Sequence, residues 1–179
     1  MIDLVANASG AGLLPLGIGS ARLQELDVGP ITSIAPFNGQ SKATDAALSK
    51  SFGLGLPEPG KSTSAVGLSL IWTGRGQYFL IGAHPGDLPA AVTDQSDAWT
   101  IVSLTGGTDT QILARLCPID TSAMEVGDVA RSLIGHMSAV IWRRENGFTI
   151  LVFRAFAQTL IHEFEGVMTS LAAQAEIEP

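Results

Sequence analysis

Residues 55–62 are the clearest candidate for chemistry in this 179-residue chain, because their sequence GLPEPGKS matches the phosphate-binding pattern G-x-x-x-x-G-K-[ST]. In that pattern backbone N–H groups wrap the phosphates, the lysine contacts the outer phosphates and the final hydroxyl binds magnesium. Here Pro57 and Pro59 remove two of the backbone donors, and Glu58 places a negative charge where phosphate would lie. The segment also precedes a predicted strand instead of opening a helix. We therefore expect no nucleotide site here.

Histidine and cysteine side chains offer little support for a metal or nucleophile site. His84 and His136 have no second ligand at metal-binding spacing, and His162-Glu163 lacks a second histidine four residues on. Cys117 follows a predicted helix, and the C-terminal end of a helix disfavours a thiolate. It is also the only cysteine, so no disulfide can form within the chain. We expect Cys117 to be a small buried hydrophobic residue and the chain to hold no metal.

Asp94 and Asp97 enclose a serine in the sequence Asp94-Gln95-Ser96-Asp97, and two carboxylates beside a hydroxyl could perform acid–base chemistry. Such a cluster is more often a turn in which Asp and Ser side chains cap backbone N–H groups. We favour the turn. The chain shows no Ser-His-Asp set, no G-x-S-x-G and no dinucleotide-binding G-x-G-x-x-G. The sequence therefore predicts no catalytic residue.

The composition excludes several classes of protein. Hydrophobic residues make up 46% of the chain and charged residues only 15%, against about 25% in an average domain. Seventeen acidic and ten basic residues give a net charge of −7, and the basic residues are scattered, which argues against nucleic-acid binding. The longest apolar runs have the length of strands, and no basic residue precedes the run at residues 13–18. We expect a cytoplasmic protein with no membrane segment.

Residues 1–30 are rich in glycine and proline, which predicts an irregular N-terminal arm. A free tail would be more polar than this segment. Leu13, Leu14 and Leu16 therefore suggest an arm that lies on a surface, either of this chain or of a partner.

The remaining chain predicts one passage used twice within one compact domain. In the first module, residues 31–92, a strand at 31–34 leads to a helix at 41–52 and to strands at 66–72 and 77–81. In the second module, residues 93–179, a strand at 99–104 leads to a short helix, strands at 139–143 and 148–153, and a final helix. This order predicts an α+β fold of two ferredoxin-like (split βαβ) modules, with antiparallel sheets and packed helices.

Local signals support individual helices of these modules. In the first helix, Ala43, Ala47, Leu48 and Phe52 form one apolar stripe. Thr108 and Gln111 fit a capping box at the start of the second helix. The apolar stripe of the final helix predicts core packing; its members are Phe156, Leu160, Ile161, Phe164, Val167, Met168, Leu171 and Ala172.

Trp72 and Trp142 occupy matching places in the two predicted hairpins. One interpretation is pseudo-symmetric core packing, and the other is an exposed sheet face that meets a partner, because tryptophan is enriched at binding hot spots. The candidate interface residues are Leu13, Leu14, Leu16, Trp72, Trp142, Arg143 and Arg144.

The sequence resembles the gamma subunit of heterotetrameric sarcosine oxidase. The resemblance runs from about residue 31 to 173 and is most specific at residues 94–99, at LARLCPID (113–120) and at ILVFRAFAQTL (150–160). In the first module, LGLPEPGKS followed by LIWTGRGQYFLIG also resembles the family, which explains the phosphate-binding pattern in another way. The family belongs to the folate-binding aminomethyltransferase-like group, whose domains pair ferredoxin-like halves. The glycine-rich first thirty residues match the family weakly.

The resemblance implies a role in a complex of alpha, beta, gamma and delta chains. Such a complex oxidises sarcosine to glycine, passes the methyl group to tetrahydrofolate as methylenetetrahydrofolate and makes hydrogen peroxide. FAD, FMN, NAD, folate and zinc are expected on the partner chains. The gamma chain carries no cofactor and packs chiefly against beta, so no catalytic residue is carried over to this chain.

Two hypotheses follow. The first is a non-catalytic assembly subunit of a flavin oxidase. The alternative is a stand-alone folate- or one-carbon-binding protein that uses a pocket between the halves, with Asp94 or Asp97 as a pterin-binding carboxylate. Folate-active relatives carry an additional barrel domain, which the sequence lacks, and this favours the first hypothesis.

Overall fold

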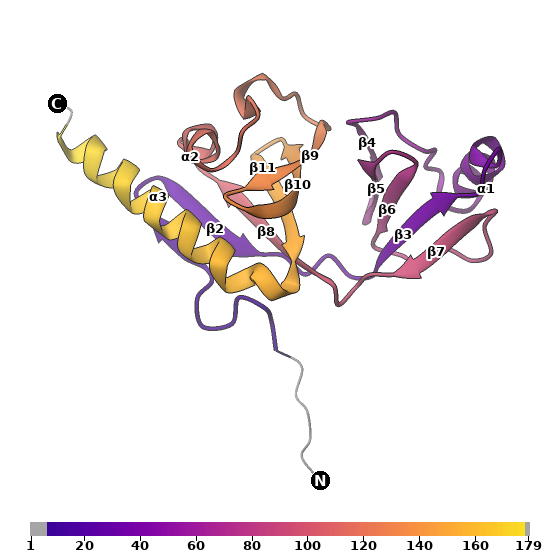
Figure 1. Cartoon of the computed structure of the whole chain (residues 1–179), viewed down its shortest axis with the longest axis horizontal. Helices are drawn as coiled ribbons and strands as arrows, with labels where there is room; N and C mark the ends of the chain where they lie inside the picture. The colour runs from indigo at the N-terminus through magenta and orange to yellow at the C-terminus, as the bar shows by residue number, and fades with distance from the viewer. Residues whose placement is uncertain (1–6, 178–179) are drawn as a thin grey trace, which may run out of the picture.

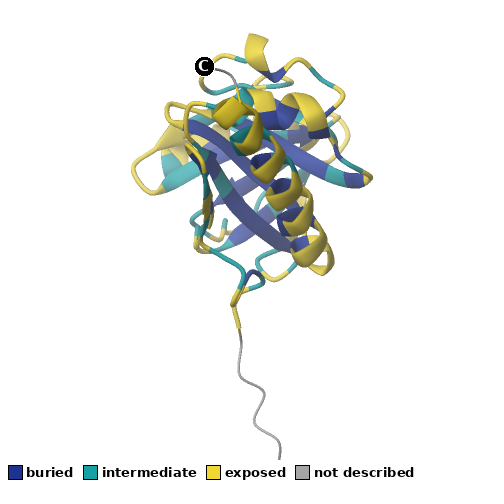
Figure 2. Cartoon of the chain, turned by 90° about the vertical axis from the view of Figure 1, so that its left-hand side faces the viewer, coloured by how far each residue is buried: buried dark blue, intermediate teal, exposed yellow. Residues whose placement is uncertain are grey.

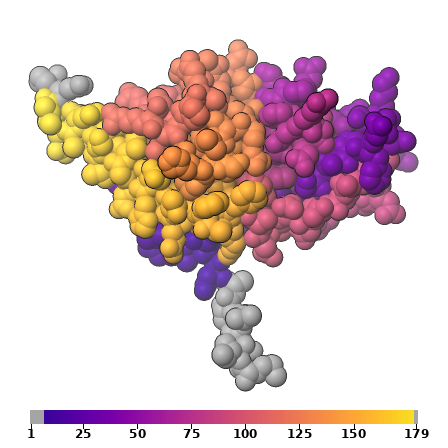
Figure 3. Space-filling view, in the orientation of Figure 1, coloured from indigo at the N-terminus to yellow at the C-terminus, as the bar shows by residue number. Residues whose placement is uncertain are grey.

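The computed structural model describes residues 7–177, and its elements stack in four layers (Figure 1). Helices α2 (Asp109–Leu116) and α3 (Ala157–Ile177) cover the outer face of a six-stranded sheet. The inner face of that sheet packs on a five-stranded sheet, whose outer face is covered by α1 (Ser41–Phe52). This arrangement confirms the α+β class with two antiparallel sheets and packed helices. In the space-filling view, the part of the molecule that contains the six-stranded sheet meets the part that contains the five-stranded sheet along one boundary (Figure 3).

The six-stranded sheet has the strand order β1-β2-β8-β11-β10-β9, and every pair of neighbours is antiparallel. Its strands are β1 (Leu16–Ile18), β2 (Ala21–Glu25), β8 (Trp99–Thr105), β9 (Val129–Ile134), β10 (Met137–Arg144) and β11 (Gly147–Phe153). Two short 3₁₀ helices flank it, η1 (Thr121–Ala123) and η2 (Arg154–Phe156).

The five-stranded sheet has the order β4-β5-β6-β3-β7, again fully antiparallel. Its strands are β3 (Ile31–Pro36), β4 (Ser62–Ala65), β5 (Leu68–Gly74), β6 (Gln77–Ile81) and β7 (Ala90–Asp94).

Both modules follow the same path of strand, helix and three strands. In each, the strand before the helix pairs with the last strand of the following meander, β3 with β6 and β8 with β11. The structure thus contains the repeat that the sequence predicted, with an additional strand after each helix, β4 and β9. Strand β4 has the polar sequence STSA at a sheet edge, which explains why hydrophobic alternation did not reveal it.

The N-terminal prediction needs a correction. Residues 16–25 are not an irregular arm: they form the hairpin β1–β2, and β2 extends the six-stranded sheet through β8. Leu23 pairs with Leu104 and is fully buried. Its burial fixes the register of β2, which glycine and proline counts could not reveal. Residues 1–6 of the predicted arm lie outside the described residues.

The three leucines of the predicted arm are half-buried. Leu13, Leu14 and Leu16 pack against the core between the six-stranded sheet and its helices. The apolar N-terminal segment therefore lies on this chain's own surface, the first of the two placements expected from the sequence.

That core is the largest of the molecule and contains the inner face of α3. Figure 2 shows buried positions along one side of this helix and exposed positions along the other. Leu160, Ile161, Phe164 and Met168 are buried, as the stripe predicted, and each contributes about 1.5–3 kcal/mol. The prediction that Phe156 belongs to this buried stripe is wrong, because Phe156 lies in η2 before the helix and is 41% exposed.

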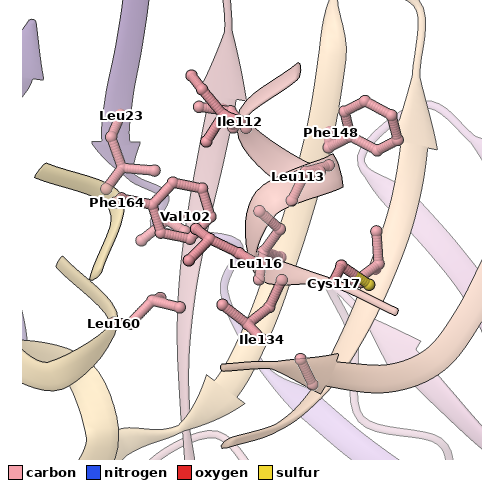
Figure 4. Close-up of a cluster of buried hydrophobic side chains, with 14 of the residues drawn as sticks. Leu23, Val102, Ile112, Leu113, Leu116, Cys117, Ile134, Phe148, Leu160 and Phe164 are labelled. Atoms are coloured by element: carbon pink, nitrogen blue, oxygen red, sulfur yellow. The ribbon is translucent and has the colours of Figure 1, made fainter. Parts of the chain in front are cut away.

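Cys117 joins the same core beside Leu113 and Leu116 (Figure 4), as a buried free thiol. The burial expected from the sequence is confirmed. The capping box predicted for Thr108 and Gln111 is not formed, because Thr108 precedes α2 without making a side-chain hydrogen bond to it. Its hydroxyl lies 3.4 Å from that of Ser20 instead.

The first helix has the bounds that the sequence predicted but a shifted inner face. Thr44 and Leu48 are its buried residues, whereas Ala43 is exposed. The Thr44 hydroxyl donates to the carbonyls of Gln40 and Pro89, at 3.0 and 3.2 Å, so a polar side chain is satisfied inside the packed face. The helix ends at Gly53, whose φ of 69° is in the left-handed region.

Candidate functional site

The segment that matches the phosphate-binding pattern joins the two modules. The Lys61 Nζ lies 2.5 Å from Asp128 Oδ1, and the Val129 N–H donates to the Gly60 carbonyl at 2.8 Å. The Ser62 hydroxyl donates to the Gly127 carbonyl at 2.8 Å. These contacts use the lysine and the hydroxyl that the pattern would offer to phosphate and magnesium.

The Lys61–Asp128 pair is electrostatically coupled. Its hydrogen bond to Asp128 raises the pKa of Lys61, and the same bond lowers the pKa of the Asp128 carboxyl. The Glu125 N–H also donates to Asp128, at 2.9 Å. Both groups are near the surface, where an ion pair contributes little to the free energy of folding. The pair therefore mainly connects Lys61 of the first module to Asp128 of the second.

A cleft of about 860 Å³ opens beside this joint, where the two sheets diverge. One wall is the serine-rich hairpin β4–β5, and the other is the inner face of the six-stranded sheet. Hydroxyl groups line both walls; they belong to Ser62, Ser64, Ser69, Ser103, Thr105 and Thr149. The carboxylates on the cleft are those of Asp27 and Glu145.

Trp142 forms the base of the cleft on β10. Its side chain is only 5% exposed, and its indole N–H donates to the Ser62 hydroxyl at 3.0 Å. It packs with Val140 in the core between the two sheets. Trp142 is therefore core packing, the first of the two interpretations, and leaves little surface for a partner to contact.

Arg144 stacks on Trp142 because residues two apart on a strand share a face. Its guanidinium carbon lies 3.9 Å from the centroid of the ring. Partial burial lowers the pKa of Arg144, and Arg144 forms no salt bridge with any residue from 7 to 177. Arg144 is thus an exposed cation on the cleft without a salt bridge, although the adjacent Glu145 carboxylate partly offsets the lowering of its pKa.

Arg143 points to the opposite face of the strand and is already engaged. Its Nη1 lies 3.4 Å from Asp109 Oδ2, and its guanidinium carbon lies 4.6 Å from the centroid of the Phe148 ring. The two adjacent arginines, which the sequence offered together as interface candidates, therefore have different surroundings.

Thr149 also lines the cleft, beside Trp142. It lies directly across from Trp142 in the β10–β11 register and across from Ser103 in the β11–β8 register. The residue is 6% exposed, but its hydroxyl is not among the buried side-chain groups that lack a hydrogen bond within residues 7–177.

Trp72 does not match Trp142. It follows Leu70 by two residues on β5 and pairs with Tyr78, so it lies on the face that α1 covers. Trp142 lies on the face between the sheets. The similar hairpin sequences are offset by one position relative to the faces of their sheets, and a one-residue offset moves a side chain to the other face.

Asp94 and Asp97 do not line the cleft. The Asp94 carboxylate accepts from the Ser96 N–H at 2.9 Å and from its hydroxyl at 2.6 Å, and these bonds lower the pKa of Asp94. The Ser96 hydroxyl accepts from the Ile31 N–H at 3.1 Å. This is the capped turn favoured from the sequence, whereas Asp97 is exposed.

Other expectations concern metals and membranes. Within residues 7–177 no three His, Cys, Asp or Glu side chains gather in a geometry that could hold a metal ion. In the same residues, no helix combines the length and apolar character that crossing a bilayer requires.

The sequence could have indicated part of the cleft. The two-residue spacing of Trp142 and Arg144 on a predicted strand places them on one face. Nothing local marked Thr149, because its burial depends on the neighbouring strands β8 and β10.

The fold and the cleft together define an α+β protein of two paired ferredoxin-like modules. No model of a known protein family matches the chain, and no curated protein matches it significantly in sequence. Among solved structures, a chain of the heterotetrameric sarcosine oxidase from Corynebacterium sp. U-96, crystallised with pyrrole 2-carboxylate, has a similar fold. The TM-score is 0.80 at 20% identity, and the match covers 93% of this chain and 96% of that one.

Proposed function

We propose that this chain is a non-catalytic assembly subunit, of the gamma type, in a heterotetrameric sarcosine oxidase. The observation that carries the proposal is the extent of the fold match, which covers 93% of this chain and 96% of a chain of such a complex. The fold of this chain therefore corresponds to nearly all of a chain in such a complex. The sequence resemblance at residues 113–120 and 150–160 points to the same subunit.

In this proposal the chemistry belongs to the partners. The complex would convert sarcosine, tetrahydrofolate and O₂ into glycine, methylenetetrahydrofolate and hydrogen peroxide in the cytoplasm. FAD, FMN, NAD, folate and zinc would be held by the alpha, beta and delta chains, and this chain would pack mainly against beta.

Exposed apolar side chains support a surface that other chains cover. Phe153 at the end of β11 and Phe156 in η2 are 40% and 41% exposed, and Leu133 on the edge strand β9 is 43% exposed. Aromatic residues are enriched in protein interfaces, and the low fraction of charged residues agrees with such a surface.

Co-expression tests the proposal. The affinity-tagged chain should co-purify with co-expressed flavin-bearing chains of a sarcosine oxidase from the same organism, and the eluted complex should show flavin absorbance and sarcosine-dependent peroxide formation. The control is the same set of chains without this one, which should assemble poorly. If those chains form an intact, fully active oxidase in its absence, the proposal is wrong.

A stand-alone folate-binding protein remains the second candidate, and the cleft of about 860 Å³ is the observation that favours it. In that case Asp94 and Asp97 would not be the pterin ligands, because neither lines the cleft. Titration calorimetry of the purified chain with tetrahydrofolate distinguishes the two candidates. Saturable binding that is lost in Arg144→Ala would favour the folate protein.

A further inference from the structure

We propose that strand β7, at one edge of the five-stranded sheet, is the place where a partner chain adds an extended strand that carries basic residues near its ends. The inference rests on the proposed function, because it names the surface through which a partner of the complex would dock. Strand β7 lies beside β3 at the margin of its sheet, away from the six-stranded sheet (Figure 1).

Two hydrogen bonds fix the direction of the backbone groups in the β3–β7 pair. The Gln95 N–H, just after β7, donates to the Ile31 carbonyl at 2.8 Å. At the other end of the pair, the Phe37 N–H donates to the Pro89 carbonyl at 3.2 Å. Residues opposite each other in an antiparallel pair alternate between hydrogen-bonded and non-hydrogen-bonded pairs. Every second residue of β7, counted from these two positions, therefore bonds to β3.

The other residues of β7 direct their backbone groups to the free edge. Counting by two makes Ala91 and Thr93 the residues that bond to β3. Val92 and Asp94 alternate with them, so their N–H and C=O groups point away from β3. Both residues are exposed, whereas Ala90, which has the same orientation, is buried. Within residues 7–177 no strand pairs with this side of β7, so the edge can accept another strand.

The other edge strands of the two sheets are protected in ways that β7 is not. Strand β9 carries Arg131, and its Val129 N–H already donates to the Gly60 carbonyl. Strand β4 follows Lys61, which pairs with Asp128, and β1 has only three residues. Charged side chains, short length and covering segments are common protection against strand addition. The β7 sequence AAVTD contains no lysine, arginine or proline, and its register with β3 has no bulge.

The side chains around β7 leave space for a strand and offer it apolar contacts. Ala91 and Thr93 lie on one face of the sheet and Val92 on the other, and all three are exposed. Phe37, whose N–H bonds to Pro89 just before β7, is 54% exposed. Aromatic residues are enriched among those that dominate binding at interfaces, so Phe37 would anchor one end of the added strand.

Three carboxylates indicate the charge of that strand. Asp94 ends β7, Asp87 precedes β7 by three residues, and Asp97 follows it by three. All three are exposed, and none forms a salt bridge within residues 7–177. The Ser96 hydrogen bonds, and to a smaller extent the charge of His84, lower the pKa of Asp94. One histidine does not balance three carboxylates, so lysine or arginine near the ends of the added strand would complete the charge pairing.

The same carboxylates argue against a second copy of this chain as the added strand. Two β7 strands that pair antiparallel about Val92 would bring Asp97 of one copy toward Asp87 of the other, at both ends of the pair. Like charges opposite each other destabilise a pair of strands. A strand of a different chain with basic ends avoids this repulsion.

Hydrogen exchange at single amides tests the inference in the isolated full chain and in the co-expressed complex. In the isolated chain the amides of Val92 and Asp94 should exchange faster than those of Ala91 and Thr93, which bond to β3. In the complex, exchange at Val92 and Asp94 should slow by at least about tenfold. An assembled complex in which neither amide slows would overturn the inference, and so would slowing at the outward amides of β9 alone.

Proline at an outward position gives a second test. Val92→Pro removes an N–H that makes no bond to β3, and edge strands tolerate proline at such positions. We expect it to weaken partner binding by at least about tenfold, whereas Val92→Thr, which keeps the N–H and the β-branched side chain, should bind as wild type does. Asp97→Lys should weaken binding by about three- to tenfold. Its control is Glu58→Lys, an exposed carboxylate in the loop before β4, which should leave binding unchanged.

The outcomes separate this inference from the proposed function. If the wild-type chain recovers no partner, the proposed function fails and this inference fails with it. If wild type and Val92→Pro recover partners equally, only this inference fails. If Val92→Pro loses thermal stability, the exchange experiment and Asp97→Lys decide. Sedimentation that finds the isolated chain to be a dimer, dissociated by Val92→Pro, would identify a second copy as the occupant and overturn the inference.

Discussion

The indole N–H of Trp142 donates to the hydroxyl of Ser62 at 3.0 Å, although 80 residues separate them in sequence. Trp142 belongs to the second module and Ser62 to the first, so this bond crosses the boundary between the modules. Ser62 makes a second bond to the second module, because its hydroxyl donates to the Gly127 carbonyl at 2.8 Å. The bond lies at the base of the cleft and ties its two walls together.

Ser62→Ala should reduce the free energy of unfolding by about 1–3 kcal/mol, because it leaves the Trp142 N–H and the Gly127 carbonyl without their partner. Chemical denaturation followed by tryptophan fluorescence measures the change. Ser64→Ala is the matched control, since the exposed Ser64 side chain bonds only to Ser69 within the same hairpin. Equal losses in the two variants would contradict the role assigned to Ser62.

Asp128→Asn should lower thermal stability only slightly at neutral pH, because the ion pair is near the surface, and should flatten the dependence of stability on pH in acid. The Lys61 hydrogen bond lowers the folded-state pKa of Asp128 below its ordinary 3.8, so its stabilisation is complete above that value and is lost as pH falls through the folded-state pKa. The pKa of Lys61 is raised above 10.5, so its stabilisation is present below that value and is lost as pH rises further.

Melting temperatures of wild type and Asp128→Asn measured across pH check this prediction. The difference between the two should be constant between these two pKa ranges and should shrink at both ends. Asp87→Asn, in an exposed loop, is the control and should change nothing. A constant difference down to the lowest pH would show that Asp128 does not act through its charge.

Glu25→Ala should loosen residues 7–10. The Glu25 carboxylate accepts from the Ser9 N–H at 2.9 Å, from the Ser9 hydroxyl at 2.5 Å and from the Gly10 N–H at 2.9 Å. Hydrogen exchange at Ser9 and Gly10 should accelerate, and the free energy of unfolding should fall by about 1–3 kcal/mol. Gln24→Ala, an exposed neighbour on the same strand, should leave exchange at these amides unchanged.

Gly147→Ala should destabilise the chain by about 2–3 kcal/mol or more. Gly147 has a φ of 126°, and a Cβ there would collide with the carbonyl oxygen of Leu104 on the neighbouring strand. Gly76→Ala is the control, because Gly76 also has a positive φ of 65° but faces open space, so it should cost about 1–2 kcal/mol. Denaturant unfolding measures the free energy of unfolding of both variants. The difference between their losses gives the cost of the Cβ collision at Gly147 apart from the cost of a positive φ.

Elements with a local signal were predictable from the sequence. The helix at residues 41–52 and the paired strands at residues 139–143 and 148–153 were predicted close to their observed bounds. Strand β2 was missed because its evidence is not local. Glycine and proline surround it, and it is a strand because Leu23 finds Leu104, about eighty residues later, in the core.

The candidate site was predictable only in part, because faces of sheets depend on tertiary packing. The sequence drew attention to Trp142 and Arg144, and the structure places both on the cleft. The sequence suggested that Trp142 and Trp72 occupy equivalent positions, but Trp142 lies on the face between the two sheets and Trp72 lies on the face that α1 covers. Ser62 was considered as part of a phosphate-binding pattern, and its actual partners come from the other module.

The place of β2 in the six-stranded sheet also affects how the protein is made. Residues 21–25 leave the ribosome early, but their partner β8 begins at Trp99, and β11 and β10 follow later still. The five-stranded sheet contains only residues 31–94, so its strands can pair before any of these have been synthesised. The first hairpin must therefore wait, with Leu23 uncovered, while a complete module is translated after it. This long-range closure predicts slow final folding and a need for protection of the β1–β2 hairpin during synthesis.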